Sequence, residues 1–163
     1  MLSKRILLII LALTMTLLPG ISAGSEQTYD AKSITTMSHP KILDILEDAK
    51  GKVVLINFFA SWCEPCLIEV PTLMAIRQTT SEDKLLLIGI SVDESMDDLL
   101  EYANKVKFNY PIHTADASIV RWARVSMIPH LIIFDKQGEV RRNAPGLVEE
   151  ADLRALLQEL MEK

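Results

Sequence analysis

The two cysteines of this 163-residue chain, Cys63 and Cys66, are separated by only two residues. A disulfide stabilises a fold mainly by closing a long loop in the unfolded chain, and this pair closes almost none. As a permanent cross-link the pair would therefore add little stability to the fold. It is better suited to a disulfide that opens and closes reversibly. We interpret the spacing as a dithiol for thiol–disulfide exchange, in which a thiolate attacks a disulfide sulfur.

The two cysteines are expected to have different roles. Cys63 should begin a helix that runs to about Gln78, where free backbone N–H groups and the positive end of the helix dipole favour an ionised sulfur. We expect Cys63 to be a partly exposed nucleophile, and Cys66, one turn further on, to be a more buried resolving thiol. Pro65 suits the first turn because its missing N–H costs nothing there. Glu64 should oppose thiolate formation slightly.

Glu69 follows Cys66 by three residues, so both side chains can face the same side of the helix. A carboxylate beside a buried thiol could accept its proton during resolution. The alternative is an ordinary surface glutamate. The apolar neighbours of Glu69, Ile68 and Val70, favour the functional interpretation enough to balance the two.

A structural disulfide and half of a metal site are the other uses of such a pair. A zinc site needs four ligands, typically two such cysteine pairs or one pair with added histidines. This chain has a single cysteine pair. We therefore expect no metal, and no cofactor other than the redox-active disulfide of Cys63 and Cys66.

The first 24 residues have the pattern of an export signal. Lys4 and Arg5 precede an apolar run over 6–18, which is the length of a signal-peptide core. We expect residues 1–24 to be a signal peptide, with an uncleaved N-terminal membrane anchor as the alternative. Either places the rest of the chain outside the cytoplasm. The polar stretch 25–38 is expected to be a flexible lead-in.

The rest of the chain, about 140 residues, has the size of one domain. Without its leader the formal charge falls from −5 to −7, because two basic residues and no acids are removed. A mildly acidic domain without a basic cluster argues against nucleic-acid binding.

Hydrophobic patterning predicts strands that alternate with helices. The expected strands are 53–59, 85–92, 131–134 and 139–143, with a short extended piece at 110–113. The expected helices are 42–49, 63–78, 96–106, 118–124 and 149–161. This order predicts an α/β fold with a central mixed β-sheet flanked by α-helices on both faces.

The stretch from Gly51 to Cys66 resembles the active-site segment of the thioredoxin superfamily. More narrowly, the chain is similar to the exported thiol–disulfide oxidoreductase branch (TlpA/ResA/CcmG-like) that serves cytochrome c maturation. Glu69-Val70-Pro71 matches that branch, and Asn57 stands where cytoplasmic thioredoxins usually carry a buried aspartate. The resemblance runs from about Ser38 to the C-terminus and implies a thioredoxin-like fold over 39–163.

The resemblance also implies a substrate site. Pro129 falls where the family carries a cis-proline facing the dithiol, although local sequence alone does not favour cis. A client would dock as an extended segment against Ile128. We also expect Trp62 to flank the dithiol and shape the contact surface, with simple packing as the alternative. Two positions depart from the family pattern: Met127 replaces a common glycine and His130 a common threonine. His130 could tune the dithiol by titrating near neutrality; we favour the alternative, a half-buried strand histidine without a catalytic part.

Together these features predict an exported thiol–disulfide reductase, monomeric, in the periplasm or at the outer face of the bacterial cytoplasmic membrane. Reduced Cys63 would attack a disulfide in a client protein, such as the haem-binding pair of an apocytochrome c, and a membrane thiol electron donor would re-reduce the enzyme. One alternative is an oxidase or isomerase of broad client range. Another is a copper-binding or delivery module using Cys63, Cys66 and either His130 or Met127, because soft thiolates select Cu(I).

Overall fold

The apolar run that precedes the two cysteines forms the central strand of the fold. The computed structural model describes residues 28–163, and β2 (Val53–Phe59) is buried along its whole length. It pairs in parallel with β3 (Leu85–Ser91) and antiparallel with β5 (His130–Phe134). A strand with neighbours on both edges and helices over both faces needs apolar side chains throughout. Asn57 is the one polar residue of β2.

Within residues 28–163, six strands form one mixed sheet in the order β1-β4-β3-β2-β5-β6. The other three strands are β1 (Thr35–Met37), β4 (Ile112–Ala115) and β6 (Val140–Pro145). The pairs β1–β4, β4–β3 and β3–β2 are parallel, whereas β5 runs antiparallel to both β2 and β6. The expected α/β class and mixed sheet are confirmed.

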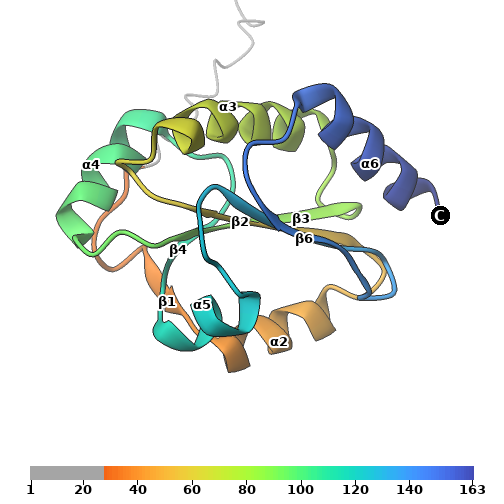
Figure 1. Ribbon diagram of the computed structural model, residues 1–163, viewed down its shortest axis with the longest axis horizontal. Coiled ribbons are helices and arrows are strands. Elements are labelled where there is room, and N and C mark those ends of the chain that lie inside the picture. The colour runs from red at the N-terminus through yellow and green to blue at the C-terminus, as the bar shows by residue number, and fades with distance from the viewer. Residues whose placement is uncertain (1–27) are drawn as a thin grey trace, which may run out of the picture.

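Helices cover both faces of this sheet (Figure 1). The helices of one layer are α3 (Glu64–Thr79), α4 (Met96–Val106) and α6 (Glu150–Glu162), and those of the other are α2 (His39–Asp48) and α5 (Ala117–Ala123). Each layer encloses its own apolar core, and alternate residues of β2 point into one or the other because strand side chains alternate between faces.

The segment 28–38 belongs to the fold, unlike the flexible lead-in that we expected over 25–38. Its strand β1 pairs with β4. Tyr29 is buried, and its hydroxyl donates to the Phe108 carbonyl at 3.0 Å. The Asn104 side chain bonds both the N–H and the carbonyl of Tyr29 at 2.9 Å. These partners lie more than seventy residues away, so nothing local in the polar stretch signals them.

The leader expected over 1–24 lies outside the described residues. Within residues 28–163, no helix combines the length and hydrophobicity that a membrane crossing requires.

Other element boundaries shift by a few residues. The helix expected to begin at Ile42 begins at His39, with Ser38 as its N-cap and Pro40 in its first turn. The extended piece expected at 110–113 is β4, which begins two residues later. In the turn after β5, Gly138 takes φ +84°, a conformation that glycine adopts without penalty.

Candidate redox site

Cys63 and Cys66 form a disulfide at the start of α3, with their Cα atoms 5.2 Å apart. Cys63 is the N-cap residue of the helix, and its Sγ accepts a hydrogen bond from the Cys66 backbone N–H at 3.3 Å. The same N–H and the positive end of the helix dipole would stabilise a Cys63 thiolate in the reduced protein. Cys63 is 5% exposed and Cys66 is fully buried. The order of exposure matches the expected roles, although Cys63 is more buried than expected.

Glu64 and Pro65, which separate the cysteines, form the exposed first turn of α3. Pro65 takes the early helical position that we expected, where no backbone N–H is needed. The Glu64 carboxylate lies at the positive end of the same helix. It therefore weakens the positive potential available to a Cys63 thiolate.

The loop that carries Trp62 and Cys63 is held by the carboxylate of Asp93. The Ser61 N–H donates to both Asp93 oxygens at 3.1 Å, and the Ser61 hydroxyl donates to Oδ1 at 2.7 Å. The Ser91 hydroxyl donates to Oδ2 at 2.6 Å. We did not predict this role for Asp93. The signal was its place just after β3, because the carboxyl ends of neighbouring parallel strands meet at one edge of a sheet.

Glu69 lies on the buried face of α3, one turn after Cys66, and is 1% exposed. Its Oε2 accepts a hydrogen bond of 2.6 Å from Nδ2 of Asn57, in β2. A surface glutamate is thereby excluded. Two residues singled out in the sequence, Asn57 and Glu69, are brought together beneath the helix turn that carries the disulfide.

Burial raises the pKa of Glu69 from 4.5 to about 7, because desolvation penalises the charged carboxylate. The backbone of Val148, the Arg142 guanidinium and the Asn57 amide lower this pKa, in decreasing order, without offsetting burial. A carboxyl group that titrates near neutrality can both accept and return a proton at the working pH. Glu69 can therefore serve as a base for Cys66.

An apolar groove of about 430 Å³ lies beside Trp62, the neighbour of Cys63. Its lining residues are Trp62, Val92, Val120, Val125, Ser126, Met127 and Ile128. Trp62 and Met127 are 68% and 64% exposed, and the Ile128–Pro129 peptide bond at its end is cis, as the resemblance implies. Large exposed apolar side chains that gather around a groove mark a contact surface for another molecule.

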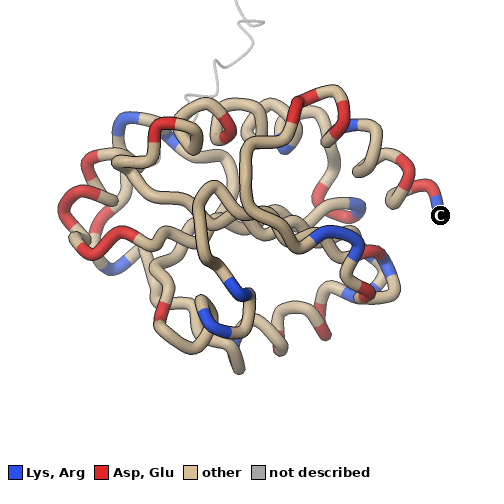
Figure 2. The backbone as a smooth tube through the Cα atoms, in the orientation of Figure 1, with Lys and Arg blue, Asp and Glu red and all other residues tan. Residues whose placement is uncertain are grey.

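Charge differs between the two sides of this site (Figure 2). Asp98, Glu101 and Lys105 of α4 line a hollow together with Ser61, next to the redox loop, and the two acids there outnumber the one base. On the other side, α5 and the residue after it carry Arg121 and Arg124. A client that approaches Cys63 would meet negative charge on the α4 side and positive charge on the α5 side.

His130 is a buried strand residue, 2% exposed. Its Nε2 lies 2.6 Å from Oδ1 of Asn143 in β6, and its ring packs edge-on against Phe58. His130 and Phe58 are register partners on the sheet face covered by α2 and α5, whereas Asn57 and Glu69 lie on the α3 face. This placement favours the strand-histidine interpretation, with more burial than expected.

Among residues 28–163, no three His, Cys, Asp or Glu side chains cluster as metal ligands would.

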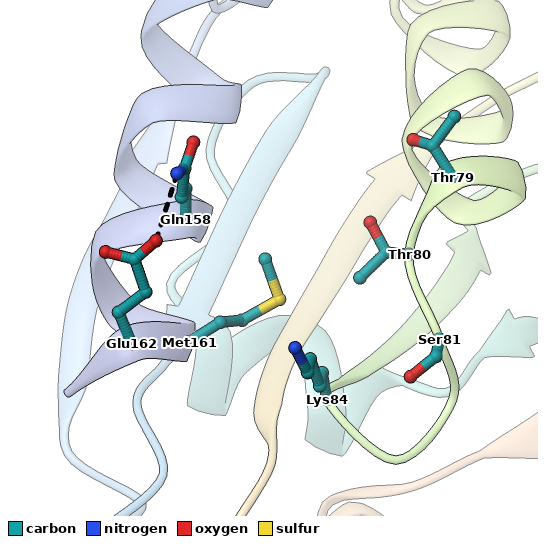
Figure 3. Close-up of a pocket in the computed structure, with 7 residues that line it drawn as sticks. All are labelled: Thr79, Thr80, Ser81, Lys84, Gln158, Met161 and Glu162. Carbon is teal, nitrogen blue, oxygen red and sulfur yellow. Dashed lines mark hydrogen bonds between the residues drawn. The ribbon is translucent and has the colours of Figure 1, made fainter.

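A second pocket, of about 420 Å³, lies between the C-terminal ends of α3 and α6 (Figure 3). It is lined by Thr79, Thr80, Ser81, Lys84, Gln158, Met161 and Glu162, with Gln158 donating to Glu162 at 3.0 Å. The 16 residues of α3 put it about 24 Å from the disulfide. It is therefore separate from the redox site.

Comparisons with known proteins agree with this geometry. A family model described as thioredoxin-like matches residues 51–140. The chain is 30% identical over 141 residues to the thioredoxin-like protein YneN of Bacillus subtilis (strain 168), covering 85% of this chain and 80% of that protein. It is 27% identical over 168 residues to the thiol–disulfide oxidoreductase ResA of Bacillus anthracis, covering 98% of this chain and 96% of that protein.

Among solved structures, the crystal structure of a thiol–disulfide isomerase from Corynebacterium glutamicum matches with a TM-score of 0.66 and 25% identity. The match covers 72% of this chain and 85% of that one. The fold is thus thioredoxin-like, with the Cys63–Cys66 disulfide at the position where a strand gives way to a helix. The chain belongs to the thioredoxin-like family and is a thiol–disulfide oxidoreductase of the ResA type.

Proposed function

We propose that this protein is an exported thiol–disulfide reductase, which uses the Cys63–Cys66 dithiol to reduce client disulfides such as the haem-binding cysteine pair of an apocytochrome c. The observation that carries the proposal is the buried Glu69, which lies one turn from Cys66 and titrates near neutrality. A base beside the resolving cysteine speeds the step that releases a reduced client. It gives no advantage to a cross-link that stays closed.

Binding precedes exchange at the apolar groove. An extended client segment would lie against the backbone of Ile128 at the cis-proline Pro129, pairing as an added strand does. The exposed side chains of Trp62 and Met127 would cover its apolar residues. This arrangement brings a client sulfur to Cys63, which is the more exposed of the two cysteines.

Exchange then proceeds in two steps. The Cys63 thiolate attacks one client sulfur, forming a mixed disulfide and releasing the other client sulfur as a thiolate, which takes a proton. Glu69 accepts the proton of Cys66, and the Cys66 thiolate attacks Cys63 Sγ. The bond between Cys63 and the client breaks, and the client sulfur that Cys63 had attacked leaves as a thiolate that also takes a proton. The client gains two electrons, and the enzyme is left with its own disulfide.

The setting of the reaction follows from the leader and from the source of electrons. The dithiol supplies both electrons, so the proposed reaction needs no bound cofactor. The pattern over 1–24 supports export past the cytoplasmic membrane, and we propose that the enzyme works in the periplasm or at the outer face of the cytoplasmic membrane. Thiols are oxidised there, so we propose a membrane thiol donor as the reductant. We also propose that the enzyme acts as a monomer, which leaves the groove at Trp62 open to clients.

A trapped intermediate tests this function. Cys66→Ser protein, reduced and mixed with an oxidised peptide that carries an apocytochrome c cysteine pair, should accumulate a mixed disulfide on Cys63. The reason is that no second thiol is present to resolve it. Mass spectrometry of the unreduced adduct measures it. Cys63→Ser is the matched control and should trap little peptide. Equal trapping by both variants would show that the nucleophile and the resolving thiol are wrongly assigned.

A further inference from the structure

Strand β6 places an arginine on the sheet face that carries the buried acid. Arg142 is the register partner of Ile133 in β5, and side chains at paired positions of neighbouring strands share a face. Ile133 packs in the same core cluster as Cys66 of α3. The adjacent residue Asn143 contacts His130 on the opposite face. Arg142 therefore lies on the α3 side of the sheet, where Glu69 is buried.

Glu69 and Arg142 each hold a buried polar atom without a hydrogen bond. Within residues 28–163, Oε1 of Glu69 and Nε of Arg142 have no partner of normal distance and angle, and neither do Oδ1 of Asn57 and the hydroxyl of Tyr110. Unpaired buried donors and acceptors are costly and rare in native proteins. One group is a cation that donates and the other an acid that accepts, and the Arg142 charge acts on the Glu69 carboxyl and lowers its pKa. Arg142 and Glu69 are therefore complementary in charge and in hydrogen bonding.

The remaining groups around Glu69 are neutral near pH 7. Asn57 of β2 and the backbone of Val148 carry no charge, and α6 contributes apolar side chains to this core. Burial raises the pKa of Tyr110 well above 10, so its phenol stays protonated. Cys66, on the same helix as Glu69, is the group that gives up its proton. Among the described residues, Arg142 is thus the cation that acts on this carboxyl.

We propose that Arg142 is a positioning residue for the resolving step, because its fixed positive charge keeps part of the Glu69 population ionised at neutral pH and so available to deprotonate Cys66. This inference rests on the proposed function. The proton moves from Cys66 Sγ to the Glu69 carboxylate, and the Cys66 thiolate then attacks Cys63 Sγ. The guanidinium exchanges no proton, because arginine stays charged throughout the working pH range.

The test is the pH dependence of resolution. A mixed disulfide between Cys63 and a chromophoric thiol is prepared on the full chain, and the release of that thiol by Cys66 is followed from pH 5 to 9. In the wild type the rate should rise through the pKa of Glu69, about 7. Arg142→Gln should move this midpoint to higher pH. A one-unit shift would slow release at pH 6 about tenfold.

Three variants separate charge from structure. Arg142→Lys keeps the cation and should restore most of the wild-type midpoint. Arg141→Gln removes the same charge from the neighbouring residue, which is exposed and lies 4.0 Å from Asp135, and should leave the midpoint in place. Arg142→Met keeps an apolar stem and replaces Arg142→Gln if that variant fails to fold.

Failure of this inference can be told from failure of the proposed function. Glu69→Gln should abolish the pH-dependent phase, and adding Arg142→Gln should then change nothing further. If Arg142→Gln and Arg142→Met keep the wild-type midpoint, or Arg141→Gln moves it as far, Arg142 has no such role and the function stands. If Glu69→Gln keeps the wild-type profile, Glu69 is not the base and both proposals fall.

Discussion

At the residue scale, the chemistry depends on how two acids and one sulfur are surrounded. Cys63 owes its favourable setting to the helix start, where a backbone N–H already points at its sulfur. Glu64 and Glu69 lie on the same helix, but Glu64 is exposed and Glu69 is buried. Burial raises the pKa of Glu69 to about 7, because water no longer stabilises its charge.

The buried Glu69 should make stability depend on pH. Its folded-state pKa of about 7 lies above the ordinary 4.5, so folding favours the protonated acid. The free energy of unfolding that the protonated Glu69 contributes is therefore fully present below pH 4.5. It is lost as the pH rises through 7, and the total loss is about 3 kcal/mol. Urea unfolding of the oxidised protein at pH 5 and pH 8 should show this loss in the wild type and not in Glu69→Gln. Glu101→Gln, at an exposed position of α4, is the control. An equal loss in Glu69→Gln would mean that the carboxyl is ionised at low cost.

At the element scale, the redox loop is positioned by the sheet edge rather than by its own sequence. The loop joins β2 to α3, and it is tied through Ser61 to Asp93, at the end of the neighbouring strand β3. The backbone also contributes, because the Val92 N–H donates to the Phe59 carbonyl at 2.9 Å. Trp62 and Cys63 are therefore presented by two strands acting together.

Asp93→Asn should loosen this loop. The change replaces charge-assisted hydrogen bonds from Ser61 and Ser91 by weaker neutral ones, and it should cost about 1–3 kcal/mol of unfolding free energy. Urea unfolding followed by fluorescence measures the loss. Asp97→Asn, which removes the same charge from the exposed first turn of α4, should cost far less. Equal stability of the two variants would mean that Asp93 does not hold the loop.

At the scale of the whole molecule, the charges around the dithiol bear on the direction of electron flow. A strong oxidant stabilises its reduced dithiol, mostly as a thiolate. Here Glu64 adds negative charge beside Cys63, and Glu69 adds a second acid beneath Cys66. Neither acid stabilises a thiolate. The balance of charges favours reduction of clients over the oxidase or isomerase alternative.

The reduction potential of the dithiol decides that question. We expect a value near that of thioredoxin, about −270 mV, because the Glu64 charge offsets part of the stabilisation that the helix start gives a Cys63 thiolate. Equilibration of the full chain with dithiothreitol or glutathione buffers measures it, with Trp62 fluorescence as the signal. Glu64→Gln should shift the potential upward by removing the repulsive charge. A wild-type value near about −120 mV, typical of a strong oxidant, would reject the reductase.

Much of the architecture and the centre of the site could be predicted from the sequence. Cys63, Pro65 and Cys66 are governed by relations within one helical turn, and the apolar run of β2 reports burial on both faces directly. Helix α6 follows from its 3.6-residue periodicity. Patterns of this kind depend on neighbours a few residues away. The site therefore begins with two cysteines whose positions the sequence already determined.

The tertiary structure alone decided which distant groups meet at those cysteines. Strand β1 pairs with β4, whose residues lie 78 positions away. Asp93 reaches the site from the loop after β3, and Arg142 from β6. Glu69 could be a surface or a buried acid until packing placed Asn57 against it. Such contacts depend on sheet order and register, which hydrophobic periodicity does not specify. Local sequence determined the dithiol, and long-range pairing determined the charges and hydrogen bonds that surround it.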